Sequence, residues 1–383
     1  MINILTIIGA RPQIIKASAI SRAIRNNFNG SINETIVHTG QHYDKNMSQI
    51  FIDELQIPSP EFNLNVGSSL HGLQTAKMIA GIEELLMKKE SDYLVVFGDT
   101  NSTLAGAIAA SKLHIPIVHI EAGLRSFDKQ MPEEINRILC DHCSSLLFSP
   151  TQKGYNNLLN EGFKNDNIAP YNANNPGIFH CGDVMYDNSM YFAKVASENS
   201  EIIIKQGLHT EEYVLVTIHR DSNTDNKEKL NSIFKALIRI ANENNQQMII
   251  PLHPRTSKLL GSNLKGKVAK NLNECKYIKI IEPVSFFDMI ELERNASMII
   301  TDSGGVQKEA YFFKKASIIL RPHTEWTEIV DAGAARLTDS DEERIVEAYQ
   351  YYKKYLNPEF DPVFGDGHAS EFICKTIIEN NRI

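Results

Sequence analysis

Short apolar runs rich in β-branched residues recur along the chain, and each is followed by a loop and a helical pattern. The runs are continuously apolar, which is typical of strands in a parallel sheet that helices cover on both faces. The predicted strands span residues 2–9, 34–40, 93–99, 115–122 and 145–150 in the first half and 213–219, 247–254, 277–283, 297–302 and 316–322 in the second.

The series of strands restarts after residues 170–183, "PYNANNPGIFHCGD", a loop rich in Asn, Pro and Gly. This break predicts an α/β protein of two doubly wound, Rossmann-like domains with a linker near 170–185. We expect the first domain to span residues 1–180, the second 181–362, and a C-terminal segment, 363–383, to hold a helix capped near Ser370. A length of 383 residues fits two domains better than one.

The composition is that of a soluble globular protein, with 42% hydrophobic and 22% charged residues. The net charge is −8 and both signs are mixed along the chain, which argues against a nucleic-acid-binding protein. A small anionic ligand is still compatible, because a few local Arg and Lys suffice to bind it. No run approaches the ~18 apolar residues of a membrane span, so we expect no membrane partner.

Five scattered cysteines and a start, "MINILTIIGARP", without a basic lead-in predict a cytoplasmic protein with no targeting segment. Cys140 and Cys143 form a C-x-x-C, but a zinc site needs a second ligand pair that the chain lacks. The chain has no H-E-x-x-H motif, and the missing G-x-G-x-x-G argues against a nicotinamide enzyme. We therefore expect neither a metal nor a cofactor.

Charged and polar residues gather where the predicted strands end, which is where ligands bind in such sheets. Because both domains present such residues, the sequence predicts a cleft lined from both sides. The residues are Arg11, Asp99, Glu121, His219, His253, Arg255, Asp302 and Ser303.

In the first domain, carboxylates are the candidates for chemistry. Asp99 and Glu121 end two strands, and "MPEEINR" adds Glu133, Glu134 and Arg137. Carboxylates that repel each other tend to have raised pKa values, as acid/base chemistry requires. The plainer alternative is that Glu133 or Glu134 only favours the start of its helix.

Basic residues follow the first strand. In "GARPQIIK", Arg11 and Lys16 lie near a predicted helix N-terminus, where they could hold a diphosphate or a negative group on a sugar. A solvated helix start is the alternative. In the second domain, His219 ends the first strand, and "PLHPRT" places His253 and Arg255 in the same layer.

Residues 298–310, "MIITDSGGVQKEA", join a strand to a helix through Gly304 and Gly305. Glycines let a ligand approach the backbone, and the N–H groups of a first helical turn suit a phosphate. An ordinary tight turn with Ser303 as the N-cap would explain the same residues.

The blocks "GARPQIIK", "TGQHYD", "GDTNSTLAGA", "HIEAGLRS", "MPEEINR", "LHPRT", "TDSGGVQKEA" and "GDGHAS" together resemble the non-hydrolysing UDP-N-acetylglucosamine 2-epimerases. The resemblance covers essentially the whole chain. It implies the fold of the B-type (GT-B) glycosyltransferases, an isomerase acting on a UDP-sugar, and a homodimer. It also implies that the C-terminal helix packs back on the first domain.

The family reaction inverts C2 of a UDP-linked 2-acetamido sugar. A base removes the C2 proton, UDP leaves C1 to give a glycal, UDP adds back, and a proton reaches the opposite face of C2. By resemblance, Asp99, Glu121 and Glu133 match the catalytic acids of the first domain, and His219 matches the family's cleft histidine. Which acid acts on which face of C2 stays open.

The resemblance also assigns UDP to the second domain. Ser303, Gly304 and Gly305 match the loop whose backbone holds the diphosphate, and Glu309 matches the carboxylate that accepts from the ribose hydroxyls. The remaining expected ligand-binding residues are Arg11, Lys16, Arg137, His253, Arg255 and Arg321.

Some residues depart from the family pattern. The segment between "AGLR" and "PEE" is two residues shorter than usual, Trp326 in "TEWTE" replaces an arginine that contacts ligand, Met289 replaces a phenylalanine, and Tyr43 replaces an arginine associated with an allosteric substrate site. This pattern is most similar to the branch acting on UDP-2,3-diacetamido-2,3-dideoxyglucuronate, with UDP-N-acetylglucosamine as the alternative substrate. A glycosyltransferase, a hydrolysing epimerase and a nucleotide-sugar sensor are the competing classes.

Overall fold

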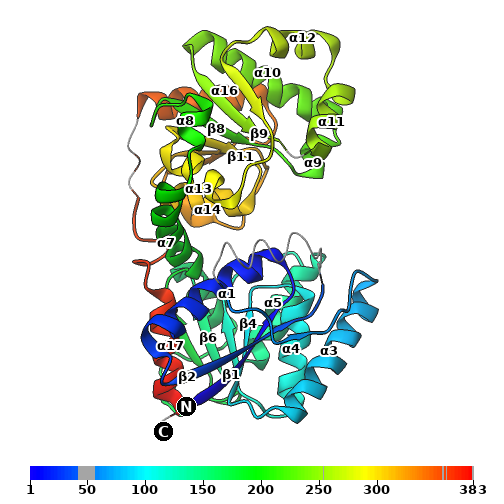
Figure 1. Cartoon of the computed structure of the whole chain (residues 1–383), viewed down its shortest axis with the longest axis vertical. Helices are drawn as coiled ribbons and strands as arrows, with labels where there is room; N and C mark the ends of the chain where they lie inside the picture. Colours follow the sequence, from blue (N-terminus) through cyan, green and yellow to red (C-terminus); the bar gives the residue numbers. More distant parts are fainter. Residues whose placement is uncertain (42–56, 253, 356–357, 359, 382–383) are drawn as a thin grey trace. The chain divides into compact units, whose positions relative to one another are not determined.

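The computed structural model describes residues 1–41, 57–252, 254–355, 358 and 360–381, without the side chains of residues 254 and 255. The chain separates into two compact units (Figure 1). Unit 1 is formed by Met1–Asn188 and Pro362–Ile383, and unit 2 by Ser189–Asp361. The division falls inside one helix, α7, which spans Val184–Asn199.

Unit 1 is built on a parallel sheet of seven strands in the order β3-β2-β1-β4-β5-β6-β7. Its strands are β1 (Ile2–Ile8), β2 (Ile32–His38), β3 (Phe62–Asn63), β4 (Tyr93–Phe97), β5 (Ile117–Ile120), β6 (Leu146–Ser149) and β7 (Gly177–His180). Its helices are α1 (Arg11–Ala23), η1 (Ile24–Phe28), α3 (His71–Lys88), α4 (Asn101–Lys112), α5 (Pro132–Cys143), α6 (Gln152–Asn160), part of α7, and α17 (Ala369–Asn381).

Alternate residues of β1 face opposite sides of this sheet, and both sides are covered. Leu5 and Ile7 belong to a core cluster with side chains of α3 and α4. Thr6 lies on the other side, where its hydroxyl donates to Glu34, which also accepts from Ser21 of α1. Figure 1 shows α1 and α17 on one side of the sheet and α3 and α4 on the other. The continuous apolar character of β1 follows from this burial on both faces.

Unit 2 has a second parallel sheet of six strands in the order β10-β9-β8-β11-β12-β13. Its strands are β8 (Tyr213–Thr217), β9 (Gln247–Pro251), β10 (Ile278–Ile281), β11 (Met298–Thr301), β12 (Ser317–Ile319) and β13 (Ala335–Leu337). Its helices are the rest of α7, α8 (Ile202–Gln206), α9 (Asp221–Thr224), α10 (Lys227–Asn244), α11 (Pro254–Asn263), α12 (Gly266–Glu274), α13 (Phe286–Asn295), α14 (Gly304–Phe312), α15 (Thr327–Asp331) and α16 (Glu342–Lys354).

Each predicted strand corresponds to a strand of the structure, and the predicted class of two doubly wound α/β domains is confirmed. Three strands were not predicted: β3, β7 and β13. β7 lies within residues 170–183, which the sequence predicted to be a linker, so that part of the prediction is wrong. Its four residues, Gly177–His180, are too few to stand out as an apolar run, and pairing with β6 decides their conformation.

The C-terminal helix α17 begins on a carboxylate from a distant part of the chain. Asp187 of α7 accepts hydrogen bonds from the backbone N–H groups of Ala369 (3.1 Å) and Ser370 (2.7 Å) and from the Ser370 hydroxyl (2.6 Å). These contacts satisfy N–H groups that have no partner within the helix. At the other end, Asn380 donates to the hydroxyl of Tyr93 at the start of β4. Both ends of α17 are thus held by unit 1.

Among the described residues, no helix combines the length and apolar character that a membrane span requires.

His38, the last residue of β2, predicts an acid sensitivity of unit 1. The side chain is buried and its Nδ1 accepts a hydrogen bond from the Gly40 N–H at 2.9 Å. Burial lowers the pKa of His38 to about 4, from an ordinary value of about 6.5. The unfolded chain therefore binds a proton over that interval and the folded chain does not. We expect this residue to remove up to about 3 kcal/mol of stability as the pH falls from about 6.5 to 4.

Urea unfolding of the parent and of His38→Asn across this pH range measures the effect. Asn keeps an acceptor near Gly40 but cannot take up a proton, so its free energy of unfolding should fall less steeply with decreasing pH. Equal pH slopes for the two proteins would contradict the assignment to His38.

Candidate functional site

The carboxyl ends of β4 and β5 place Asp99 and Glu121 next to each other in unit 1. These strands are neighbours, and the N–H of Gly98 donates to the carbonyl of Ile120. Gly98 has φ +61°, which glycine adopts at no steric cost. Glu121 also has a positive φ, +71°, a conformation that costs a non-glycine residue about 1–2 kcal/mol. Strain of this kind at a strand end is a feature of functional sites.

Lys16 of α1 forms an ion pair with Glu121, and both side chains are largely buried. A Cβ atom on Gly98 would lie 3.2 Å from the Lys16 ammonium and 3.3 Å from the Glu121 carboxylate. The glycine therefore leaves the room that the pair occupies. Burial makes this pair much less sensitive to salt than a surface ion pair.

Gln13, which was not predicted, connects its helix α1 to the end of β1, the end of β4 and the start of α4. Its carbonyl oxygen accepts from the N–H groups of Gly9 (2.9 Å) and Ala10 (3.2 Å), after β1. Its amide donates to the carbonyl of Phe97 (3.1 Å) at the end of β4 and to the hydroxyl of Thr103 (3.0 Å) in α4. Its position in the first turn of α1 was a detectable signal, since residues there often cap the preceding backbone.

Beneath Gly98 lies a buried charged network that was also not predicted. Nε2 of His119 lies 2.8 Å from the carbonyl oxygen of Gly98, and Nδ1 lies 2.6 Å from the Asp141 carboxylate. Both ring nitrogens face acceptors, so both carry protons and the ring is an imidazolium. Burial opposes this charge, but contacts with Cys140 and the Asp141 carboxylate raise the pKa of His119 well above its ordinary value.

Asp141 is shared by several donors besides His119. It accepts from Arg125 at 2.7 Å and from the backbone N–H of Gly123 at 3.1 Å. Burial alone would raise the pKa of Asp141, but the charges of His119 and Arg125 keep it below its ordinary value. The network thus holds the backbone near Glu121 at two points: the carbonyl of Gly98, just after β4, and the N–H of Gly123, after β5.

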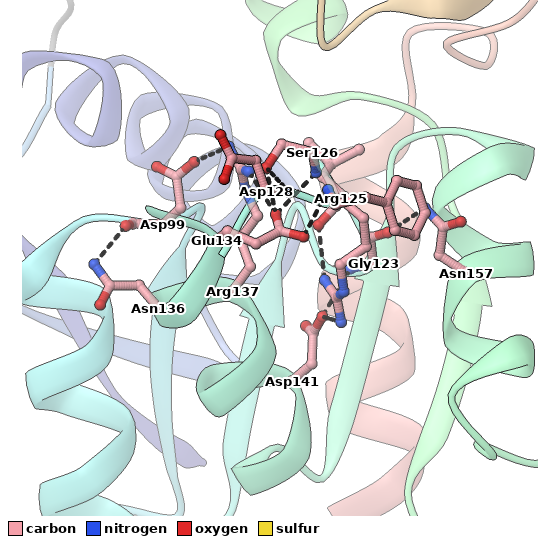
Figure 2. A network of polar contacts seen from close by, with 12 residues as sticks. Asp99, Gly123, Arg125, Ser126, Asp128, Glu134, Asn136, Arg137, Asp141 and Asn157 are labelled. Atoms are coloured by element: carbon pink, nitrogen blue, oxygen red, sulfur yellow. Dashed lines mark hydrogen bonds and ion pairs between the residues drawn. The ribbon is translucent and has the colours of Figure 1, made fainter. Parts of the chain in front are cut away.

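Asp99 is paired with Arg137 of α5, and Figure 2 shows this contact within a larger polar network. The Arg137 guanidinium lies 2.5 Å from Asp99 and 3.1 Å from Glu134. Asn136, one residue earlier, donates to the backbone carbonyl of Asp99 at 2.9 Å. Consecutive side chains of one helix therefore hold both the backbone and the carboxylate of Asp99.

Glu134 is buried and organises the loop before its own helix. It accepts from the N–H and hydroxyl of Ser126 (2.8 and 3.0 Å) and from the N–H of Phe127 (3.0 Å). Burial raises the pKa of Glu134, but these bonds and that from Arg137 outweigh burial and leave it below its ordinary value. Glu133, the neighbour that was assigned the catalytic role, is exposed.

The predicted mutual repulsion of the carboxylates does not describe this arrangement. Glu121 faces Lys16 and Asp99 faces Arg137, so each carboxylate has a cation as its immediate neighbour. The sequence could not show this pairing, because it depends on where α1 and α5 cross the ends of β4 and β5.

In unit 2, the end of β8 brings His219 to Asp302, which follows the neighbouring strand β11. Nδ1 of His219 lies 3.0 Å from the Asp302 carboxylate, and the histidine side chain is 54% exposed. The buried carboxylate also accepts from the backbone N–H groups of His219 and Arg220 and from Asn223. Burial would raise the pKa of Asp302, but His219 and the other donors keep it low. Asp302 therefore fixes the ring orientation of an exposed histidine.

Ser303 is the N-cap of α14, and Gly304 and Gly305 form the helix start. The Ser303 hydroxyl accepts from the N–H of Val306 at 3.4 Å, as the plainer alternative predicts. A Cβ on Gly304 would meet Glu325 at 2.8 Å, whereas a Cβ on Gly305 would have its nearest neighbours at 3.9 and 4.0 Å. The cap accounts for Ser303, but no crowding by the described residues accounts for Gly305.

Arg321, after β12, is buried and pairs with Glu325 at 2.9 Å. Glu325 in turn lies against Gly304, so this ion pair borders the start of α14. Burial and the nearby Arg321 lower the pKa of Arg220, which shows that two guanidinium groups lie near each other here. Two guanidinium groups, of Arg220 and Arg321, therefore lie near the start of α14 together with the carboxylates of Glu325 and Asp302.

Two residues of unit 2 depart from the family pattern, and the side chains of both pack against other residues of that unit. Trp326 is buried, and the ammonium of Lys308, on α14, lies 4.0 Å from its ring centre. Met289 packs against an apolar cluster that includes Val306 of α14.

Some predicted residues cannot be placed in these clusters. His253 and Tyr43 lie outside the described residues, and so does the side chain of Arg255, a residue of α11. Arg11 is exposed at the first position of α1. Glu309 is half-buried on α14, and a Cβ on Gly305 would lie 4.0 Å from its carboxylate.

Comparison with known proteins finds 2-epimerases that match nearly the whole chain. The family model described as UDP-N-acetylglucosamine 2-epimerase matches residues 24–378. A "UDP-N-acetylglucosamine 2-epimerase homolog" of Methanococcus maripaludis is 46% identical over 98% of this chain and 99% of its own. The UDP-2,3-diacetamido-2,3-dideoxy-D-glucuronate 2-epimerase of Pseudomonas aeruginosa is 43% identical over 97% and 98%.

Solved structures extend the comparison to the fold. The crystal structure of Methanocaldococcus jannaschii UDP-GlcNAc 2-epimerase, in complex with UDP-GlcNAc and UDP, has 42% identity and a TM-score of 0.80, covering 99% of this chain and 100% of that one. The structure of Phytolacca americana UGT2, with 11% identity and a TM-score of 0.63, shows similarity of the fold alone.

Proposed function

Because the chain belongs to the UDP-N-acetylglucosamine 2-epimerase family, and is thus an isomerase, we propose that it inverts C2 of a UDP-linked 2-acetamido sugar without net hydrolysis. The supporting observation is the pair of strand-end carboxylates in unit 1, Asp99 and Glu121, each held against a cation. Proton transfer at a carbon needs side chains of this kind in fixed positions. A glycosyltransferase or a sensor has no need of them.

We assign the proton transfers to the residues of unit 1. One carboxylate removes the proton from C2 as UDP leaves C1, and a second group delivers a proton to the opposite face of C2 as UDP adds back. Asp99, Glu121 and Glu133 are the proposed acids and bases, and His219 of unit 2 is the proposed histidine of the reaction. Lys16 and Arg137 orient the carboxylates toward the substrate.

UDP is assigned to unit 2. The N–H groups at the start of α14 and the guanidinium of Arg321 suit the diphosphate. Glu309, one turn further along α14, is the proposed acceptor for the vicinal hydroxyls of the ribose. Retention of UDP distinguishes epimerisation from hydrolysis, because UDP that escaped would leave the glycal to end as free sugar.

For the sugar, we propose UDP-2,3-diacetamido-2,3-dideoxyglucuronate, with UDP-N-acetylglucosamine as the alternative. The sequence pattern around Trp326 and the Pseudomonas aeruginosa relative support the uronate, whereas the Methanocaldococcus jannaschii structure, of nearly equal identity, supports the alternative. Arg11, exposed at the first position of a helix without acidic residues in its first turn, is the cation that we assign to a uronate carboxylate.

Proton NMR of the purified protein in D2O tests both the reaction and the substrate that we propose. Each nucleotide sugar is offered in a separate tube. Deuterium at C2 together with a new manno-configured UDP-sugar establishes the epimerase, and the tube that reacts identifies the substrate. Release of free sugar and UDP would instead establish a hydrolysing enzyme, and binding of both compounds without exchange would favour a transferase or a sensor.

We also propose a cytoplasmic homodimer. The five cysteines are free thiols, in keeping with a reducing compartment. Light scattering of the purified protein tests the dimer, and a monomeric mass would reject it.

A further inference from the structure

Glu293 of α13 is a buried carboxyl group that the proposed reaction does not use. Its side chain is 1% exposed, and neither of its oxygens receives a hydrogen bond from an N–H or O–H group of the described residues. Its helix packs on α14, and its carboxyl group lies against the side chain of Glu309 on that helix. Glu309 is the residue assigned to the ribose hydroxyls.

Two carboxyl groups in contact, one of them deeply buried, cannot both be ionised, because each would be an acceptor facing another acceptor. One of them must carry a proton, which it then donates to the other. Glu293 is the more deeply buried, and burial disfavours its charged form. The proton therefore belongs to Glu293, and Glu309 is the anion.

We propose that Glu293 is a positioning residue that stays a neutral carboxylic acid and donates a hydrogen bond to Glu309, so that the Glu309 carboxylate is oriented toward the ribose hydroxyls of UDP. This inference rests on the proposed UDP site. It extends that site inward by one residue and gives the buried acid a specific role: it fixes the rotamer of Glu309 and keeps the carboxylate anionic. An anionic acceptor binds hydroxyls more strongly than a neutral one.

The groups around Glu293 support the neutral form. Burial and the charge of Glu309 raise the pKa of Glu293 well above its ordinary value. From β8, Tyr213 donates its hydroxyl to the carbonyl of Leu292 at 2.6 Å and brings no positive charge. On α13 itself, Arg294 lies 3.5 Å from Glu291.

Charged groups on the adjoining helices are engaged elsewhere. Lys308 of α14 lies against the ring of Trp326. Lys205 of α8, a helix that packs on α13, is exposed and pairs with Glu201 at 3.2 Å. Among the described residues, no ion pair joins a cation to Glu293, so the proton on its carboxyl group is what compensates for burial.

The test compares three substitutions by calorimetric titration with UDP and with 2′-deoxy-UDP near neutral pH. Glu293→Gln keeps the shape and a hydrogen-bond donor, so UDP affinity should stay within about threefold of the parent. Glu293→Leu keeps the volume but removes the donor, and UDP affinity should fall about tenfold, the effect of a lost hydrogen bond to a charged group. Affinity for 2′-deoxy-UDP should change much less, because one of the hydroxyls that Glu309 receives is absent.

Glu291→Gln is the matched control. It makes the same chemical change two residues away on the same helix, at a buried carboxylate whose contacts are Arg294 and Asn295. It should leave the affinities for both nucleotides unchanged. The infrared difference spectrum of the parent minus Glu293→Gln should also show the stretch of a protonated carboxyl group, which a purely structural role for an ionised Glu293 would not produce.

The outcomes separate this inference from the proposed function. If the parent binds no UDP, the proposed function itself fails. If the parent binds UDP but Glu293→Leu binds it equally well, or loses the same factor for 2′-deoxy-UDP, the positioning role is wrong while the epimerase stands. Equal losses in Glu293→Gln and Glu293→Leu would also overturn it, since the retained donor should rescue binding.

Discussion

Replacement of Asp99 by Asn should reduce turnover by about 10²–10⁴-fold, the usual contribution of a general acid or base, while UDP binding is largely kept. Asn has the same size, and its amide oxygen can still accept from Arg137, which lies 2.5 Å from Asp99 in the parent. It cannot exchange a proton at working pH. UDP is assigned to unit 2, so its affinity should not depend on a residue of unit 1 that acts on the sugar. Exchange of the C2 proton in D2O and a UDP titration measure the two quantities.

The matched control is Asp92→Asn, at the opposite end of the same strand. Asp92 precedes β4 and accepts a hydrogen bond from the N–H of Asn3 at 2.7 Å. Because ligands bind at the carboxyl ends of such strands, this variant should keep full turnover. An Asp99→Asn enzyme that exchanges the C2 proton at nearly the parent rate would show that Asp99 is not one of the proton-transfer groups.

Replacement of Gly305 by Val should weaken UDP binding at least about 100-fold, which corresponds to about 2.7 kcal/mol. Gly305 is the second residue of α14, where a Cβ would find ordinary contact distances of 3.9 and 4.0 Å within the protein. The described residues therefore leave room for a Cβ atom at this position. The branched methyl groups would occupy the space over the N–H groups at the helix start, where the diphosphate is assigned.

Gly266→Val provides the control for this prediction. Gly266 is the first residue of α12, in the same unit, and a Cβ there would have no neighbour within 4 Å. Calorimetric titration should show unchanged UDP affinity for this variant, and thermal unfolding should give similar midpoints for both variants and the parent. Parent-like UDP binding by Gly305→Val would move the diphosphate away from the start of α14.

Much of this structure could be predicted from the sequence, because the pattern of apolar and polar residues reports a local property, the burial of each segment. The apolar runs marked the strands that are buried on both faces, and they fixed the parallel, doubly wound class. The same patterns missed β7 and β13, whose residues, "GIFH" and "ARL", are held by their neighbours in the sheet rather than by a run of apolar residues. The ends of the strands could also be predicted, because a charged residue directly after an apolar run marks the point where the buried strand stops.

By itself, then, the sequence determined where the candidate residues stand along the chain: Asp99 and Glu121 after strands, and Ser303 to Gly305 at the start of a helix. Only the tertiary structure decided their partners. Lys16 reaches Glu121, Asp187 caps a helix that begins at Ala369, and Glu293 meets Glu309. Such pairs join elements that are far apart in the chain and depend on which strands and helices become neighbours in space. Periodicity encodes the burial of a residue, whereas the charge that a carboxyl group carries is decided by what it is buried against.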